Sequence, residues 1–81
     1  MNTYFGLLAE FGTAHVPLVT IAKNYFGMDA TKAKRLAATR QFPIPTFRLG
    51  GQKSPWLIAI DDLAMHLDEK KLQARSEFND A

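Results

Sequence analysis

Apolar residues recur at helical spacing in several stretches of this chain, and the first is residues 3–11. Residues three or four positions apart share one side of an α-helix, so this spacing predicts a short helix with a buried side. Asn2 or Thr3 precedes the stretch and suits the N-cap position. Gly6 weakens a helix, and a strand that pairs with a later hairpin is the alternative. The expected buried side consists of Tyr4, Leu7, Leu8 and Phe11.

Residues 18–40 predict two short helices joined by a tight turn, and the rest of the chain is organised around them. Gly27 interrupts the apolar periodicity and is expected to end the first helix. Asp29 is a good N-cap for the second helix, because its carboxylate can accept hydrogen bonds from free backbone N–H groups. The first helix is expected to bury the side formed by Ile21, Ala22, Tyr25 and Phe26.

The second of these helices has two sides of different character. Its inner side, Ala33, Leu36 and Ala37, can lie close against the first helix, and we expect Leu36 to be buried between the two. Two crossed helices, the second with a basic outer side, are typical of the helix-turn-helix that reads the DNA major groove. An amphipathic helical hairpin with a solvated basic side is the alternative. The outer side consists of Thr31, Lys32, Lys34, Arg35 and Thr39.

The next segment, residues 41–60, predicts a β-hairpin. Two prolines in QFPIPTFRLGG end the preceding helix, and apolar and polar residues then alternate from Thr46 to Leu49 as in a strand. GGQKSP is a turn signal, and WLIAI is a β-prone apolar run that returns from it. A basic hairpin directly after a candidate recognition helix is called a wing, and an ordinary solvated hairpin is the alternative. Its tip carries Gln52, Lys53 and Ser54.

A last helix is expected after Asp61 or Asp62, either of which can serve as its N-cap. Its expected buried stripe consists of Ile60, Leu63, Ala64 and Leu67. Met65 and Leu72 form a second apolar line that could be a dimer contact, although single exposed apolar residues are common. The polar tail, residues 76–81, is expected to be frayed, with Phe78 as its only anchor.

Charge is segregated along the chain although the net charge is only +2. Residues 1–22 hold one acidic residue and no basic one, residues 23–53 hold seven basic residues and one acidic one, and residues 54–81 hold three basic and six acidic ones. A basic block of this kind is the electrostatic pattern expected of a phosphate-binding surface. The sequence therefore favours a nucleic acid as the partner of residues 23–53.

Composition limits the remaining possibilities. The 81 residues are enough for one domain, residues 1–81, and the absence of cysteine excludes disulfides, thiolate metal sites and a cysteine nucleophile. No phosphate loop, metal-ligand cluster or nucleophile–base pair is found, so we expect neither an enzyme nor a cofactor. No apolar run is long enough to span a bilayer, and we expect a cytoplasmic protein with no membrane partner.

Three segments carry a resemblance to a known family, namely NTYFGLLAEFG, VPLVTIAKNYF and IDDLAMHLDEKK. They resemble small winged-helix proteins of the excisionase and MerR-like type and, more narrowly, the pyocin activator protein family of bacterial and prophage regulators. The resemblance implies a DNA-binding activator of bacteriocin or phage-related genes. It also implies a fold that is mainly α with a small β-hairpin, a winged helix-turn-helix.

We expect double-stranded DNA as the partner, bound by a homodimer or a cooperative array, because one recognition helix reads only a short half-site. Two alternatives remain at this point. One is an excisionase-like accessory factor that bends DNA for recombination, and the other is a protein-interaction module such as an anti-repressor. The candidate DNA-binding residues are Thr31, Lys32, Lys34, Arg35, Thr39, Arg40, Arg48, Gln52 and Lys53.

Overall fold

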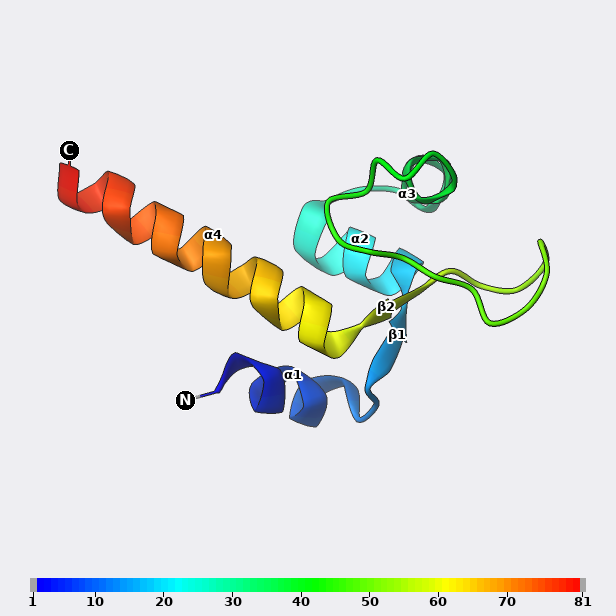
Figure 1. Ribbon diagram of the computed structural model, residues 1–81, viewed down its shortest axis with the longest axis horizontal. Coiled ribbons are helices and arrows are strands. Elements are labelled where there is room, and N and C mark those ends of the chain that lie inside the picture. Colours follow the sequence, from blue (N-terminus) through cyan, green and yellow to red (C-terminus); the bar gives the residue numbers. More distant parts are fainter. Residues whose placement is uncertain (1, 81) are drawn as a thin grey trace.

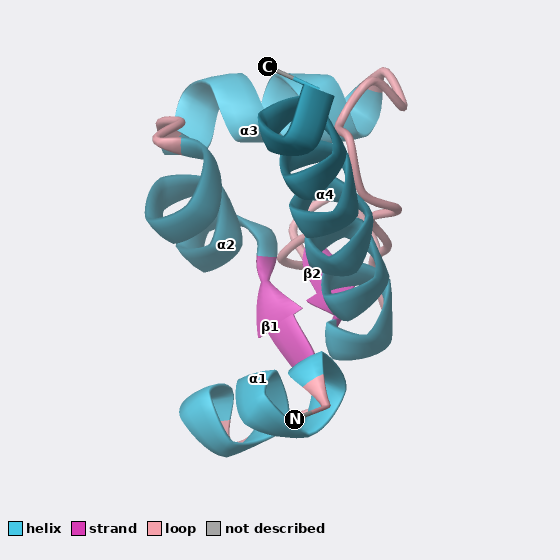
Figure 2. Cartoon of the chain, turned by 90° about the vertical axis from the view of Figure 1, so that its left-hand side faces the viewer, coloured by secondary structure: helices cyan, strands magenta, loops and turns pink. Residues whose placement is uncertain are grey.

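The computed structural model describes residues 2–80, which form four helices and two short strands (Figure 1). The expected fold class, mainly α with a small antiparallel β-structure, is confirmed. Figure 2 shows the two strands side by side, between α1 and α2. In chain order the elements are α1 (Thr3–Phe11), β1 (His15–Pro17), α2 (Leu18–Phe26), α3 (Ala30–Ala38), β2 (Leu57–Ala59) and α4 (Ile60–Asp80).

The first stretch is a helix, so the alternative of a strand is excluded. Asn2 caps α1, because its side-chain oxygen accepts a hydrogen bond from the Tyr4 backbone N–H at 2.8 Å. α1 packs against the first half of α4 (Figure 1) and buries Leu7 there. The Thr3 hydroxyl donates a hydrogen bond to the Asp68 carboxylate at 2.6 Å, which fixes the start of α1 on α4.

A second hydrogen bond joins α1 to α2. The Tyr25 hydroxyl donates to the Glu10 carboxylate at 2.9 Å. Burial, and then the Glu10 carboxylate as hydrogen-bond acceptor and negative charge, raise the pKa of the Tyr25 hydroxyl above its ordinary value. This hydrogen bond links α1 to α2.

The turn between α2 and α3 has the predicted features. Gly27 ends α2 in the left-handed conformation, with φ of 60°, which glycine adopts without steric strain. Asp29 caps α3, and its carboxylate accepts a hydrogen bond from the Lys32 backbone N–H at 2.7 Å. The two helices are packed through alanines, because Ala33 is 0% and Ala37 is 2% exposed.

The expectation that Leu36 is buried between the two helices is wrong. Leu36 is only partly buried, at the edge of the core. Ala33 and Ala37 are one helical turn apart and lie side by side toward α2, whereas Leu36 is rotated by about 80° or more from this line. The small side chains, and not the leucine, therefore set the distance between α2 and α3.

The sheet pairs two segments that are far apart in the sequence. β1 and β2 are antiparallel, and Val16, which is buried, lies opposite Ile58, also buried. The predicted hairpin partner of β2 contributes only one pair, in which Phe47 and Leu57 exchange backbone hydrogen bonds of 3.0 and 2.8 Å. Pro45 has no N–H to donate to a strand ladder, and Gly50 and Gly51 favour a turn. Neither side of Phe47 therefore favours a longer strand opposite β2.

α4 begins two or three residues earlier than predicted. It starts at Ile60, whose N–H donates to the Ala14 carbonyl at 2.8 Å. Asp61 and Asp62 therefore lie in the first helical turn, and neither is the cap. Their negative charges are favourable there, because the N-terminal end of a helix carries partial positive charge. The predicted stripe is confirmed, since Ile60, Leu63 and Ala64 are buried and Leu67 packs on the core.

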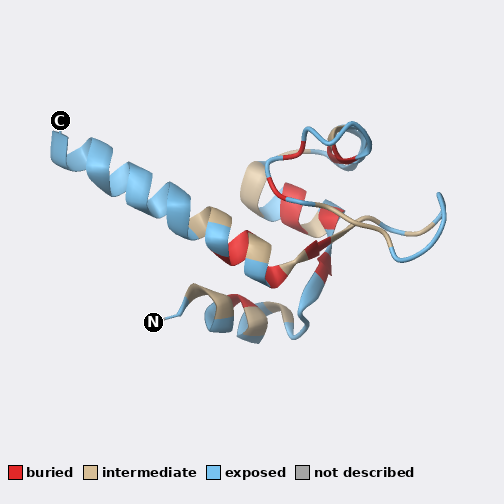
Figure 3. Cartoon of the chain, in the orientation of Figure 1, coloured by how far each residue is buried: buried red, intermediate tan, exposed pale blue. Residues whose placement is uncertain are grey.

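The second half of α4 extends away from the core and is exposed (Figure 3). The helix continues to Asp80, through residues for which the sequence predicts a frayed tail, and Ala81 lies outside the described residues. This stretch is rich in good helix formers, which explains its continuation. Phe78 is 81% exposed, so the expectation that it anchors the tail is wrong.

Candidate functional site

The outer side of α3 is available to a partner. All five residues of this side are exposed, as the sequence predicts: Thr31, Lys32, Lys34, Arg35 and Thr39. Arg35 lies at the centre of this side, because its position on the helix is opposite the buried Ala33 and Ala37. α3 therefore presents a short basic surface held in place from behind by close packing on α2.

Thr39 differs from the other four. Its hydroxyl donates a hydrogen bond to the Arg35 carbonyl at 3.0 Å, within the last turn of the helix. The hydroxyl proton is therefore engaged in ending α3, and the oxygen remains free only as an acceptor. Nothing in the sequence distinguishes Thr39 from its neighbours, because a threonine at a helix end can either contact a partner or hydrogen-bond to the last turn of its own helix.

Residues 48–55, which we call the basic loop, project from the pair formed by Phe47 and Leu57 (Figure 1). The Ser54 N–H donates to the Gly51 carbonyl at 2.9 Å, which closes the turn at the tip. A Cβ at Gly50 would meet the Ser54 hydroxyl oxygen, so a larger residue there would require the serine side chain to rotate away. Gln52 and Lys53 are exposed at the tip.

The structure brings α3 and the basic loop together at one concave surface. Lys34 from α3 lines the same hollow as Arg48, Gln52 and Lys53 from the loop, and we call it the loop hollow. Its volume is about 340 Å³. Three of the four residues carry positive charge, so the surface attracts anions. The remaining wall consists of Pro17, Leu18, Val19, Ser54, Pro55 and Trp56.

Trp56 positions Arg48 at this hollow. The guanidinium carbon of Arg48 lies 4.1 Å from the centre of the Trp56 ring, which is the geometry of a cation–π contact. Among residues 2–80, Arg48 Nε and Trp56 Nε1 are buried nitrogens that find no hydrogen-bond acceptor. A buried donor without an acceptor is unfavourable, and an anion in the loop hollow would offer one to the guanidinium group.

Trp56 was not among the residues predicted to act in the site, because the pattern of WLIAI indicates only a strand. The sequence does contain a hint of this role, because a tryptophan directly follows the basic loop, where its ring can pack against an arginine of the loop. The pairing with Arg48 could not be predicted, since it depends on the single pair Phe47–Leu57, which aligns the two sides of the loop.

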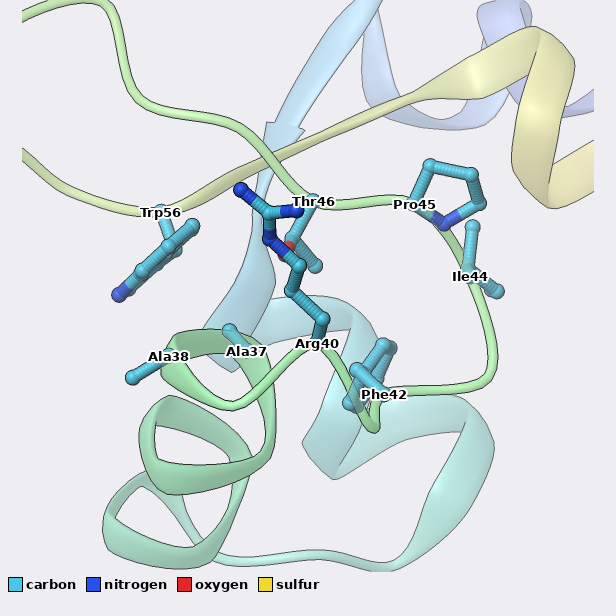
Figure 4. A pocket seen from close by; sticks show the side chains of 8 residues that line it. All are labelled: Ala37, Ala38, Arg40, Phe42, Ile44, Pro45, Thr46 and Trp56. Carbon is cyan, nitrogen blue, oxygen red and sulfur yellow. The ribbon is translucent and has the colours of Figure 1, made fainter.

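Arg40 is separate from the other candidate residues. It follows α3 in the left-handed conformation, with φ of 58°, and its N–H donates to the Ala37 carbonyl at 3.2 Å. Its side chain lines a different hollow at the end of α3, shown in Figure 4. The structure therefore groups Lys34, Arg48, Gln52 and Lys53 around the loop hollow, leaves Thr31, Lys32, Arg35 and Thr39 on the outer side of α3, and sets Arg40 apart.

Comparison with known protein families finds a match. A family model described as pyocin activator protein PrtN matches residues 3–74, which include all of the chain from α1 to the greater part of α4. No curated protein and no solved structure matches the chain. Within residues 2–80, none of the helices combines the length and the apolar character that crossing a bilayer requires.

Proposed function

The chain belongs to the pyocin activator protein PrtN family, and we propose that it is a sequence-specific DNA-binding protein that activates transcription of bacteriocin or prophage-related genes. Family membership supports the regulatory part of this proposal. The DNA-binding part rests on one observation: Lys34 of α3 and the basic residues of the loop line the same hollow. Two basic elements that converge in this way suit a DNA strand passing between them.

In this proposal α2 and α3 form a helix-turn-helix and α3 enters the major groove. An α-helix with its side chains is about 10–12 Å across, which fits the major groove at about 12 Å wide, and the nine residues of α3 extend about 13 Å along it. Arg35 is exposed and lies opposite the buried side of α3, so it is well placed to donate two hydrogen bonds to a guanine edge. Thr31 and Lys32, near the start of the helix, lie beside it and contact bases or the adjoining phosphates.

The basic loop acts as the wing. A DNA strand that leaves the major groove at α3 would run past the loop hollow, where Lys34, Arg48 and Lys53 neutralise its phosphates. Arg48 is held by Trp56 before DNA arrives, so less conformational freedom is lost on binding than for an unsupported arginine. Gln52 contributes a neutral hydrogen-bonding group at the same surface.

Assembly on DNA completes the proposal. A single α3 reads only a short half-site, and specific operators require more contacts, so we propose a homodimer or a cooperative array on DNA. Met65 and Leu72 are 61% and 70% exposed on α4 and are two helical turns apart on the same side. They are the proposed contact between copies.

Selection of bound fragments from bacterial genomic DNA by the purified protein tests the proposal. Enrichment of sites next to promoters of bacteriocin or prophage genes is the expected result. Enrichment of tandem sites at phage attachment regions, with strong bending of the DNA, would replace activation by the recombination role. No enrichment of any sequence would contradict specific DNA binding and would leave a protein partner, as for an anti-repressor.

A further inference from the structure

The hollow at the end of α3 has the size and lining of a small-molecule site. Its volume is about 540 Å³, within the usual range for ligand pockets of about 300–1,000 Å³. Such pockets combine apolar walls with a few placed polar groups, and here Arg40 and Thr46 supply polar groups among the eight lining residues. We call it the α3-end pocket, and its lining is Ala37, Ala38, Arg40, Phe42, Ile44, Pro45, Thr46 and Trp56.

Arg40 is the only charged residue of the lining, and Figure 4 shows its guanidinium group reaching across the pocket toward Thr46 and Trp56. Its backbone is left-handed, a conformation that is unfavourable for residues other than glycine. A glycine would end α3 here without strain, whereas the arginine retains a charged side chain at the cost of that strain. Strained residues of this kind cluster at functional sites.

The aromatic walls are fixed in place. Phe42 is 8% exposed and packs edge-on against Phe26, with ring centres 5.2 Å apart. Thr46 and Trp56 each directly precede a member of the bonded pair Phe47–Leu57. The pocket is therefore formed before any ligand binds, which favours a rigid, flat molecule that can lie against an aromatic ring.

We propose that the α3-end pocket binds a small planar organic anion, such as an aromatic carboxylate. Its ring packs along Trp56 and Pro45, beside the Arg40 side chain that stands between them in Figure 4. Its carboxylate accepts hydrogen bonds from the Arg40 guanidinium group, which offers a planar pair of donors, and from the Thr46 hydroxyl. This inference does not depend on DNA binding, because Arg40 lines only the α3-end pocket, although Trp56 lines both hollows.

Titration of the ¹⁵N-labelled protein with 2-naphthoate, followed by NMR, tests the proposal. Trp56 is the only tryptophan, so its indole N–H resonance reports directly on the pocket. We expect saturable shifts of Trp56, Thr46 and Arg40 with naphthoate. The neutral analogue 2-naphthalenemethanol and inorganic phosphate should each bind about tenfold more weakly or worse, because one lacks the charge and the other lacks the ring.

Arg40→Gln should weaken naphthoate binding by about tenfold or more, and Arg75→Gln, which removes an exposed arginine on α4, should leave it unchanged. Both arginines are exposed, and thermal melting of each variant verifies that it is folded. Equal affinity of Arg40→Gln and the wild type would overturn the proposal. So would equal binding of phosphate and naphthoate, or naphthoate shifts confined to the exposed half of α4.

Discussion

Arg48 and Trp56 stand on opposite sides of the basic loop and meet with the guanidinium carbon 4.1 Å from the ring centre. Only one residue pair, Phe47 and Leu57, closes the basic loop by backbone hydrogen bonds, so the contact between Arg48 and Trp56 adds to the stability of the loop. It also places a positive charge at the loop hollow, beside Lys34 of α3.

Two substitutions of Arg48 distinguish the effect of its positive charge from the effect of its packing on Trp56. Arg48→Gln should weaken binding to specific and random DNA alike and lower the slope of log affinity against log salt by about one unit. Arg48→Lys should keep most of that slope, because it keeps the charge, but should change Trp56 fluorescence, because an ammonium group does not stack on a ring as a guanidinium group does. Fluorescence identical to the wild type in both variants would show that the contact does not form in solution.

Close packing of α3 on α2 requires small side chains at Ala33 and Ala37. Ala33→Leu should destabilise the protein by about 1–3 kcal/mol, because the site is 0% exposed and has no room for a larger side chain. Leu36→Ala should cost less than about 2 kcal/mol, below the range for buried leucines, because Leu36 is only partly buried. Urea unfolding measures both, and the reverse order of effects would mean that α3 is rotated relative to this structure.

Ala33 and Leu36 show what the sequence could and could not predict. Helix boundaries depend on local signals, so Asn2, Gly27 and Asp29 marked the ends of helices correctly. The periodicity of α3 identified its inner side but could not rank Leu36 against Ala33, because hydrophobicity favours the leucine while close approach of helices favours the alanine.

The sequence pattern could not predict contacts between segments that are distant in the chain. β1 has only three residues and no alternation that would reveal it, and its pairing with β2 is set by the burial of Val16 against Ile58. The hollow shared by Lys34 and the basic loop also depends on tertiary packing. The basic block was visible in the sequence, but its division between the loop hollow and the α3-end pocket was not.

High pH should weaken the fold through Tyr25. Its pKa is raised in the folded state, so its contribution to stability is fully present below the ordinary tyrosine pKa of about 10 and is lost as the pH rises through the raised value. Tyr25→Phe cannot ionise and should show a smaller loss of stability between about pH 8 and about pH 11. Urea unfolding of both proteins at these pH values measures the difference, and equal losses would exclude this role of Tyr25.

The exposed apolar residues of α4 provide a test of assembly. If Met65 and Leu72 join copies on DNA, a double substitution to aspartate should reduce cooperativity and leave the stability of the monomer nearly unchanged, because both side chains are exposed. Analytical ultracentrifugation of protein–DNA mixtures measures the number of copies bound. An unchanged number and cooperativity would exclude this surface as the contact.

Arg35 and Lys53 should contribute to DNA binding in different ways. Arg35→Ala should lose about 1–3 kcal/mol on the preferred site and much less on a scrambled duplex, because a base contact carries sequence information. Lys53→Ala should weaken both duplexes alike and lower the salt slope by about one unit, because phosphate contacts do not depend on sequence. Lys70→Ala, on the exposed half of α4, is the matched control and should change neither quantity.

The most direct test of DNA binding is fluorescence anisotropy of the wild-type protein on the selected and scrambled duplexes across a series of salt concentrations. We predict tighter binding to the selected duplex, and for both duplexes an affinity that falls steeply with salt, because Lys34, Arg48 and Lys53 would each neutralise a phosphate. An affinity that is equal for the two duplexes and indifferent to salt would contradict the proposed DNA interface.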